Sequence, residues 1–86
     1  MKTTAWQLLI VAQDPLARAG LATLLANDPT CNVIGQISGE TDILSEVTVY
    51  RPDVIIWDLG WDPTPALEQI DIMRETELPV VALLPD

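Results

Sequence analysis

Four short runs of hydrophobic residues alternate along the chain with longer segments of mixed character. The runs are rich in Val, Ile and Leu and occupy residues 7–12, 32–37, 54–57 and 80–84. Continuous apolar runs of this length are typical of strands that are buried on both faces of a parallel sheet. The run at 32–37 also contains Asn and Gln, which favours a position near a sheet edge.

The segments between these runs show the spacing of amphipathic helices, with apolar residues three and four positions apart. The predicted helices span residues 15–26, 41–50 and about 65–75. The first and third begin with a cap residue followed by proline, a favoured way to start a helix. These pairs are Asp14 with Pro15 and Thr64 with Pro65. The predicted inward stripes are Ala17, Leu21, Leu24 and Leu25, then Ile43, Leu44, Val47 and Tyr50, then Ala66, Leu67, Ile70 and Met73.

Strands that alternate with helices of about 10–15 residues are typical of βαβ units, which have parallel strands and right-handed crossovers. The chain has 86 residues, which is room for one domain with a modest core. No repeat, linker or low-complexity segment interrupts the pattern. We therefore predict a single α/β domain over residues 1–86.

The composition narrows the classes of function. Thirteen acidic and four basic residues give a net charge of −9, which argues against a nucleic-acid or anionic-membrane surface. The chain has no His, so neither histidine acid–base catalysis nor an ordinary zinc site is available. The single cysteine, Cys31, is expected to be a small core residue. No apolar run approaches the roughly 20 residues of a membrane span, and no signal-peptide pattern opens the chain, so we expect a cytoplasmic domain.

The run at 54–57 ends at Asp58, and Gly60 begins the loop that follows. In open α/β sheets the ligand crevice lies outside the carboxyl ends of the strands. A single carboxylate there is a nucleophile, a metal ligand or a hydrogen-bonded strand-end group. The first strand-to-helix turn, at residues 12–15, has no glycine, which argues against a dinucleotide site or a P-loop. Gly60 also stands where a dehalogenase-type phosphatase would have a second Asp.

Two sequence motifs resemble those of the receiver domains of bacterial two-component response regulators, which have the CheY-like fold. They are Pro15-Leu16-Ala17-Arg18-Ala19-Gly20-Leu21 and Arg51-Pro52-Asp53-Val54-Ile55-Ile56-Trp57-Asp58-Leu59. Shorter matches lie at residues 9–11, 24–25, 33–35 and 67–68. The resemblance is greatest to the subgroup that carries a helix-turn-helix DNA-binding output domain, and it covers residues 7 to about 84.

The resemblance implies a three-layer, flavodoxin-like parallel sheet with the family's strand order 2-1-3-4-5. This chain would supply four strands in the order 2-1-3-4 and three helices, without the family's last helix, strand and helix. Its fourth strand would then be an apolar sheet edge, and its first helix would lack a neighbour. We therefore expect a homo-oligomer, formed through strand four or through the uncovered helix face.

The resemblance also implies that Asp58 is the phosphoacceptor, which takes a phosphoryl group from a sensor histidine kinase with the help of Mg²⁺. The family's metal-binding acidic pair falls on Ala12 and Gln13, and its hydroxyl residue falls on Leu84. The family's lysine lies beyond the last residue of the chain. The candidate ligands of a weak Mg²⁺ site are Asp58, the Gly60 carbonyl and Asp14.

Three functions stay open at this point. The first is a degenerate pseudo-receiver that works through contact with a kinase or another signalling protein. The second is a receiver phosphorylated on Asp58 that controls transcription through a DNA-binding domain absent from this chain. The third is a small phosphotransfer or phosphatase enzyme.

Residues near Asp58 have simpler structural readings beside the functional ones. Asp14 is expected to cap the first helix rather than bind metal. Trp57 is expected to pack between sheet and helix, and Trp61 to cover the crevice left by the missing metal, with a ligand clamp formed by the two rings as the alternative. Asp62 is expected to be solvated, although it is a possible substitute ligand. The acids Asp71, Glu75 and Glu77 are expected to form a solvated helix face.

Overall fold

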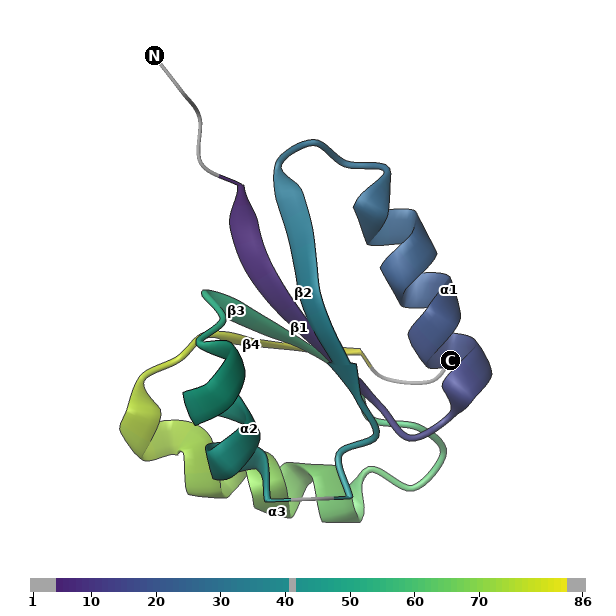
Figure 1. The fold of residues 1–86 in the computed structure, drawn as a ribbon. Coiled ribbons are helices and arrows are strands. Elements are labelled where there is room, and N and C mark those ends of the chain that lie inside the picture. The colour runs from purple at the N-terminus through teal and green to yellow at the C-terminus, as the bar shows by residue number, and fades with distance from the viewer. Residues whose placement is uncertain (1–4, 41, 84–86) are drawn as a thin grey trace.

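The computed structural model describes residues 5–40 and 42–83, which form a four-stranded sheet with helices on both sides (Figure 1). The strands are β1 (Trp6–Ala12), β2 (Cys31–Ile37), β3 (Val54–Asp58) and β4 (Val80–Leu83). The helices are α1 (Pro15–Ala26), α2 (Ile43–Tyr50) and α3 (Thr64–Ile72), and α3 continues into the 3₁₀ helix η1 (Met73–Thr76). The four strands fall where the apolar runs predicted them.

The sheet is parallel throughout, in the order β2-β1-β3-β4. The predicted strand order is therefore confirmed, and β2 lies at an edge as its polar residues indicated. Leu9 of β1 pairs with Ile55 of β3, which pairs in turn with Val80 of β4. Because the strands are parallel, the carboxyl ends of β1, β2 and β3 meet at one edge of the molecule.

The main core lies between the sheet and the pair α2 and α3. Leu9, Val11, Ile55 and Trp57 project from the strands and pack against Ile43 of α2 and Met73 of η1. All six are at most 3% exposed. The four strand residues among them have odd numbers, because a strand sends every second side chain to the same face.

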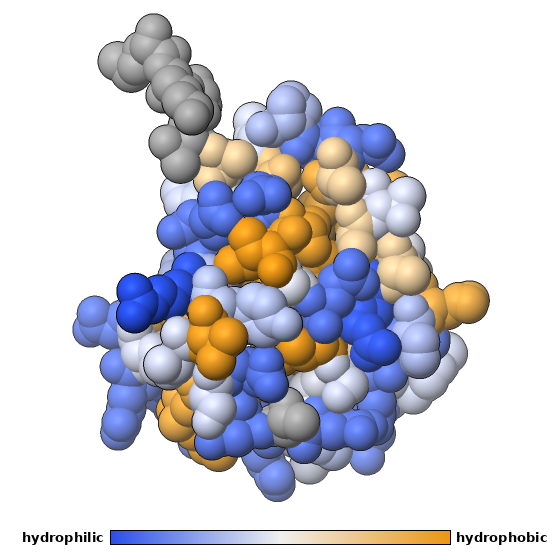
Figure 2. All heavy atoms as spheres, viewed as in Figure 1, coloured by the Kyte–Doolittle hydropathy of each residue, from blue (hydrophilic) through white to orange (hydrophobic). Residues whose placement is uncertain are grey.

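Among the described residues, α1 alone covers the opposite face of the sheet (Figure 1). Leu8 and Ile10 of β1 are buried there, but none of the described α1 residues is buried. Farther along this face, Ile56 of β3 is half-buried and its partner Val81 of β4 is exposed. Hydrophobic residues also reach the surface over α1 in the view of Figure 2.

Strand β2 has an irregularity next to the place where Tyr50 of α2 lies against it. Leu8 pairs with Val33 and Leu9 with Gly35, so Ile34 forms a β-bulge. A Cβ built on Gly35 would lie 2.5 Å from Tyr50 Cε1. Glycine at position 35 therefore leaves the room that the Tyr50 ring occupies.

One residue in each predicted helical stripe is exposed instead of covered. These residues are Leu24, Leu44 and Leu67. Each is the sequence neighbour of a covered residue, namely Leu25, Ile43 and Ala66, and so points about 100° away around the helix. Each helix contacts the sheet along one narrow stripe, which leaves these flanking leucines outside the core.

The predicted helix boundaries need three corrections. The N-cap of α3 is Pro63, not Thr64, because the chain turns into helical conformation one residue earlier. Regular α3 ends at Ile72, and the predicted last turn is 3₁₀. The second helix begins at Ile43, capped by Asp42, while its predicted first residue, Thr41, lies outside the described residues.

Candidate functional site

Asp58 is the last residue of β3 and lies at the carboxyl edge of the sheet, where the sequence predicted it. It pairs with Ala12 of β1 on one side and Leu83 of β4 on the other. The residue is half-buried, and its Oδ1 accepts a hydrogen bond from the Gly60 backbone N–H at 3.1 Å. Gly60 has a φ of +71°, a conformation that glycine adopts without strain and that turns the chain sharply after the strand.

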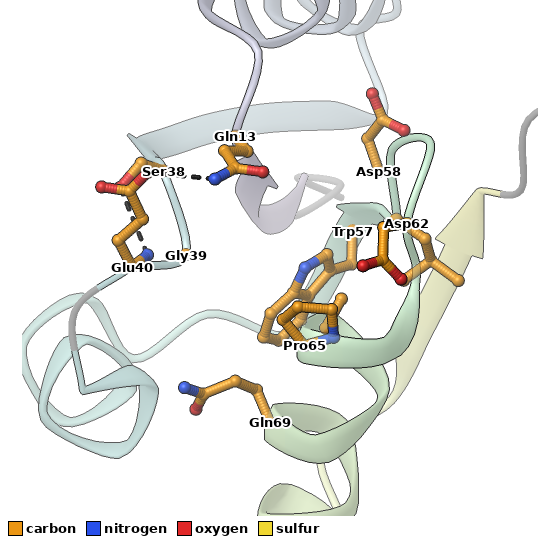
Figure 3. Close-up of a pocket in the computed structure, with 11 residues that line it drawn as sticks. Gln13, Ser38, Gly39, Glu40, Trp57, Asp58, Asp62, Pro65 and Gln69 are labelled. Atoms are coloured by element: carbon orange, nitrogen blue, oxygen red, sulfur yellow. Dashed lines mark hydrogen bonds between the residues drawn. The ribbon is translucent and has the colours of Figure 1, made fainter.

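A cavity of about 290 Å³ adjoins Asp58 between three loops and α3. Figure 3 shows Gln13, Ser38 and Glu40 on one side of it, Asp58 and Asp62 on the other, and Gln69 reaching in from α3. The lining is completed by Gly39, Trp57, Leu59, Pro65 and Ala66. The cavity thus combines amides and carboxylates with a hydrophobic wall.

The end of β1 supplies no carboxylate to this cavity. Ala12 is fully buried, and its carbonyl accepts a hydrogen bond from Arg18 Nη1 at 2.8 Å. Gln13 Nε2 donates to Glu40 Oε1 at 3.2 Å and so joins the β1–α1 loop to the β2–α2 loop (Figure 3). A buried methyl group and an amide thus stand at the two positions where an acidic pair would be needed to attract a divalent cation.

The three predicted magnesium ligands have different places around the strand end, where Gly60 N donates to Asp58 Oδ1 at 3.1 Å. Asp58 lines the cavity, whereas neither Asp14 nor Gly60 does. Asp14 Oδ1 accepts a hydrogen bond from Leu16 N at 2.9 Å and caps α1, as predicted. Within residues 5–40 and 42–83, no group of three or more His, Cys, Asp or Glu is placed to hold a metal ion. The described residues therefore offer Mg²⁺ no carboxylate cluster, although this ion prefers several oxygen ligands in octahedral geometry.

The two tryptophans beside Asp58 have opposite environments. Trp57 is 3% exposed and packs between the sheet and the helices, as predicted. Trp61 is 91% exposed and does not line the cavity, so the prediction that it covers the crevice is wrong. The loop turns at Gly60 and carries the Trp61 ring outward into solvent.

Other predicted positions have mixed outcomes. Asp62 is exposed but also lines the cavity, and its Oδ1 accepts a hydrogen bond from Thr64 N at 3.2 Å.

Cys31 is half-buried and lies outside the core cluster, so the prediction that it is a core residue is wrong. The reason is that β2, which carries Cys31, is an edge strand. Leu84, the residue at the family's hydroxyl position, lies outside the described residues. Asp71, Glu75 and Glu77 are exposed as predicted, and Asp71 pairs with Arg74 at 3.0 Å.

Sequence reasoning missed Ser38, Glu40 and Gln69 as cavity residues. Ser38 and Glu40 follow β2, so the rule that strand ends meet at one edge could have drawn attention to them. Gln69 lies in the second turn of α3, and only the packing angle of that helix decides that it faces the cavity.

The fold and the strand-end carboxylate define a receiver-type domain, and comparisons with known proteins support this class. The chain is 34% identical over 76 residues to protein-glutamate methylesterase/protein-glutamine glutaminase 3 of Anaeromyxobacter dehalogenans, covering 87% of this chain and 22% of that protein. It is 27% identical over 78 residues to the transcriptional regulatory protein BtsR of Escherichia coli, covering 91% of this chain and 33% of that protein. The chain thus spans about a fifth to a third of the curated relatives it matches. No protein-family model matches it.

Solved structures show the same fold. The signal receiver domain of the putative response regulator NarL from Mycobacterium tuberculosis superposes with a TM-score of 0.73 at 24% identity, covering 94% of this chain and 65% of that one. The isolated REC domain of RcsB from Salmonella enterica, solved with the phosphomimetic BeF₃⁻, gives a TM-score of 0.76 at 18% identity, covering 96% and 64%. The chain is therefore homologous to the receiver domains of two-component response regulators and shares their CheY-like fold. No helix in the described ranges is long and apolar enough to span a membrane.

Proposed function

We propose that this chain is a pseudo-receiver, a receiver-type domain that takes part in two-component signalling through protein contact and not through phosphorylation of Asp58. Its residues 1–86 act in this proposal as one domain, without enzymatic activity. The observation that carries the proposal is the set of side chains at the carboxyl end of β1. Ala12 and Gln13 stand there, so no acidic pair lies beside Asp58. Gln13 is hydrogen-bonded to Glu40, and Arg18 donates to the Ala12 carbonyl.

The physical argument concerns charge neutralisation. A carboxylate that attacks a phosphoryl group approaches another anion, and two unit charges about 4 Å apart repel by about 4 kcal/mol at a surface-like effective dielectric constant of about 20. A metal ion ordinarily removes this repulsion. Asp58 has Glu40 and Asp62 as fellow acids around the cavity, but these lie in different loops and accept their hydrogen bonds from Gln13 and Thr64.

The test is exposure of the purified chain to a phosphodonor and to a phosphoryl mimic. With acetyl phosphate and millimolar Mg²⁺, we expect no phosphate adduct by intact-protein mass spectrometry. With beryllofluoride and Mg²⁺, we expect no chemical-shift change at Asp58 or Gly60 by NMR. An adduct on Asp58 that disappears in Asp58→Asn would overturn the proposal.

A variant with a restored carboxylate shows whether the missing acid explains the absence of a Mg²⁺ response in the wild-type chain. Gln13 is exposed, so Gln13→Asp returns one carboxylate to the cavity without burying a charge. We expect this variant to show a Mg²⁺-dependent shift near Asp58 that the wild-type chain lacks. An equal response of both proteins would mean that the missing acid does not limit metal binding.

A second candidate function is favoured by Asp58 itself, because its carboxylate is half-exposed beside a cavity rather than buried. In this alternative the chain accepts a phosphoryl group from a sensor histidine kinase, binds Mg²⁺ weakly, and regulates transcription through a separate DNA-binding domain. The name of its relative BtsR, a transcriptional regulatory protein, is in keeping with this role. The mass-spectrometric experiment above separates the two candidates.

We also infer self-association, most simply a dimer formed through the β4 edge or through the exposed side of α1. Within the described residues β4 pairs only with β3, and Val81 on it is 47% exposed. Unpaired strand edges readily pair with other chains. Light scattering at micromolar concentration should give a dimer, which Val81→Lys weakens and Val49→Lys, at an exposed position of α2, leaves intact. A wild-type monomer would contradict the inference.

A further inference from the structure

The cavity beside Asp58 has an apolar wall and an acidic rim. Buried Trp57 and Leu59 form part of the wall, together with Ala66. The acidic residues Glu40, Asp58 and Asp62 lie around the rim of the cavity. Figure 3 shows Asp62 close to Trp57 and Pro65, and Glu40 on the facing side. A side chain with a hydrocarbon stem and a cationic end matches both halves of such a cavity.

The carboxylates of the rim have no cationic hydrogen-bond partner among the described residues. Among the described residues, the hydrogen bonds that these carboxylates accept come from neutral donors, namely the Gln13 amide and the backbone N–H groups of Gly60 and Thr64. The ion pair found in the same ranges joins Asp71 to Arg74, and neither lines this cavity. Arg18, whose Nη1 donates to the Ala12 carbonyl, does not line the cavity, so a cation that approaches the rim from outside meets a net negative potential.

Trp61 adds a separate feature to this surface. Its ring is 91% exposed and directly precedes Asp62 in the loop between β3 and α3. Pro63 restricts the same loop, so little flexibility is lost when a partner binds it. Exposed tryptophans are frequent anchors of protein interfaces, and they also bind cationic side chains over their faces.

We propose that this surface, formed by the cavity, its acidic rim and Trp61, docks a partner protein by accepting one of its arginine or lysine side chains. The cavity volume of about 290 Å³ is near the lower limit of about 300 Å³ for ligand pockets, which suits a single side chain. A free amine of that size would leave Trp61 uncovered, whereas a protein segment covers both. The proposal deepens the pseudo-receiver function, since it names the chemistry of the partner.

The test is titration of the complete chain with the peptide Ac-Arg-Arg-Arg-Arg-NH₂, followed by calorimetry and tryptophan fluorescence. The matched probe replaces each arginine by citrulline, which has the same shape without the charge. We expect the arginine peptide to bind and the citrulline peptide to give no measurable binding. Asp62→Asn and Trp61→Ala should each weaken the arginine peptide at least fivefold, and circular dichroism should show that both variants remain folded.

Two control variants separate this surface from the general negative charge of the chain. Glu75→Gln removes one charge outside the cavity, and Trp6→Ala removes an exposed tryptophan at the opposite end of β1. Both should bind the peptide within twofold of wild type. Equal weakening by Glu75→Gln and Asp62→Asn would overturn the proposal.

Two further results would also overturn it. One is the absence of peptide binding at millimolar concentration. The other is binding of free agmatine as tight as that of the peptide, with no effect of Trp61→Ala, which would make the cavity a site for a small amine. All titrations are done without Mg²⁺ or phosphodonor, so a failure here is distinct from a failure of the pseudo-receiver proposal, which depends on phosphorylation of Asp58.

Discussion

The two faces of the sheet are covered to very different degrees. Toward α2 and α3, Leu9, Ile55 and Trp57 are at most 3% exposed and contact residues from both helices. Toward α1, Ile56 is only half-buried and Val81 is 47% exposed. The stability of the chain should therefore come mainly from the first face. The second face leaves apolar surface exposed, which is available for contact with another protein chain.

The largest expected difference between the faces is the cost of removing an apolar side chain. Ile55→Ala leaves a cavity in a fully buried site and should lower the free energy of unfolding by about 3–4 kcal/mol. Leu24→Ala, at a position 70% exposed on α1, should change it by less than about 0.5 kcal/mol. Urea denaturation followed by circular dichroism measures both. Equal effects would mean that the α1 face is as well packed in solution as the other.

Two glycines give a second contrast, because replacing each by alanine should change the stability of the chain in opposite directions. Gly35→Ala places a methyl group 2.5 Å from the Tyr50 ring and should destabilise the chain by about 1–3 kcal/mol. Gly20 lies inside α1 with nothing within 4 Å of an added Cβ, so Gly20→Ala should stabilise by about 0.5–1 kcal/mol through helix propensity. Thermal unfolding reports the sign of each. A partial rescue of Gly35→Ala by Tyr50→Leu would identify the ring as the cause.

Removing the two helix caps should have different effects, one on the stability of the whole chain and one mainly on the local stability of α1. Asp42 accepts hydrogen bonds from Leu44 N and Ser45 Oγ at the start of α2, and Asp14 accepts one from Leu16 N at the start of α1. Loss of such a cap costs about 1 kcal/mol. Because α2 contributes to the main core, Asp42→Ala should lower the global unfolding free energy by about that amount. Asp14→Ala should mainly increase hydrogen exchange in α1, with a smaller global effect. Unchanged exchange in α1 would contradict this division.

The strands and their order followed from the sequence because apolar runs and βαβ alternation leave few topologies open. Asp58 could be placed at the carboxyl edge of the sheet because it directly follows an unbroken apolar run. The exposure of Leu24, Leu44 and Leu67 could not be predicted, because periodicity defines a helical stripe but not its width. The outward direction of Trp61 depends on the turn at Gly60, and residue type alone favoured a buried ring.

The smallest expected effect on stability comes from a substitution in the turn between α1 and β2, on the sparsely covered side of the molecule. The Thr30 hydroxyl donates to Asp28 Oδ1 at 2.7 Å, and together with the Thr30 backbone N–H it holds the pKa of Asp28 below its ordinary value of 3.8. Thr30→Ala removes the hydroxyl but keeps the N–H, so the pKa of Asp28 should rise partway toward 3.8. Carbon NMR of the side-chain carboxyl measures this directly.

The sign of the accompanying pH dependence follows from linkage. Because folding lowers the pKa of Asp28, its contribution to stability is complete above pH 3.8 and is lost as the pH falls through the folded-state pKa. The stability difference between wild type and Thr30→Ala should therefore shrink below about pH 4. Asp28 is fully exposed, so the difference should be small at every pH and smaller still at high salt. A difference that grows on acidification would mean that Thr30 acts through the packing of the turn and not through the Asp28 carboxylate.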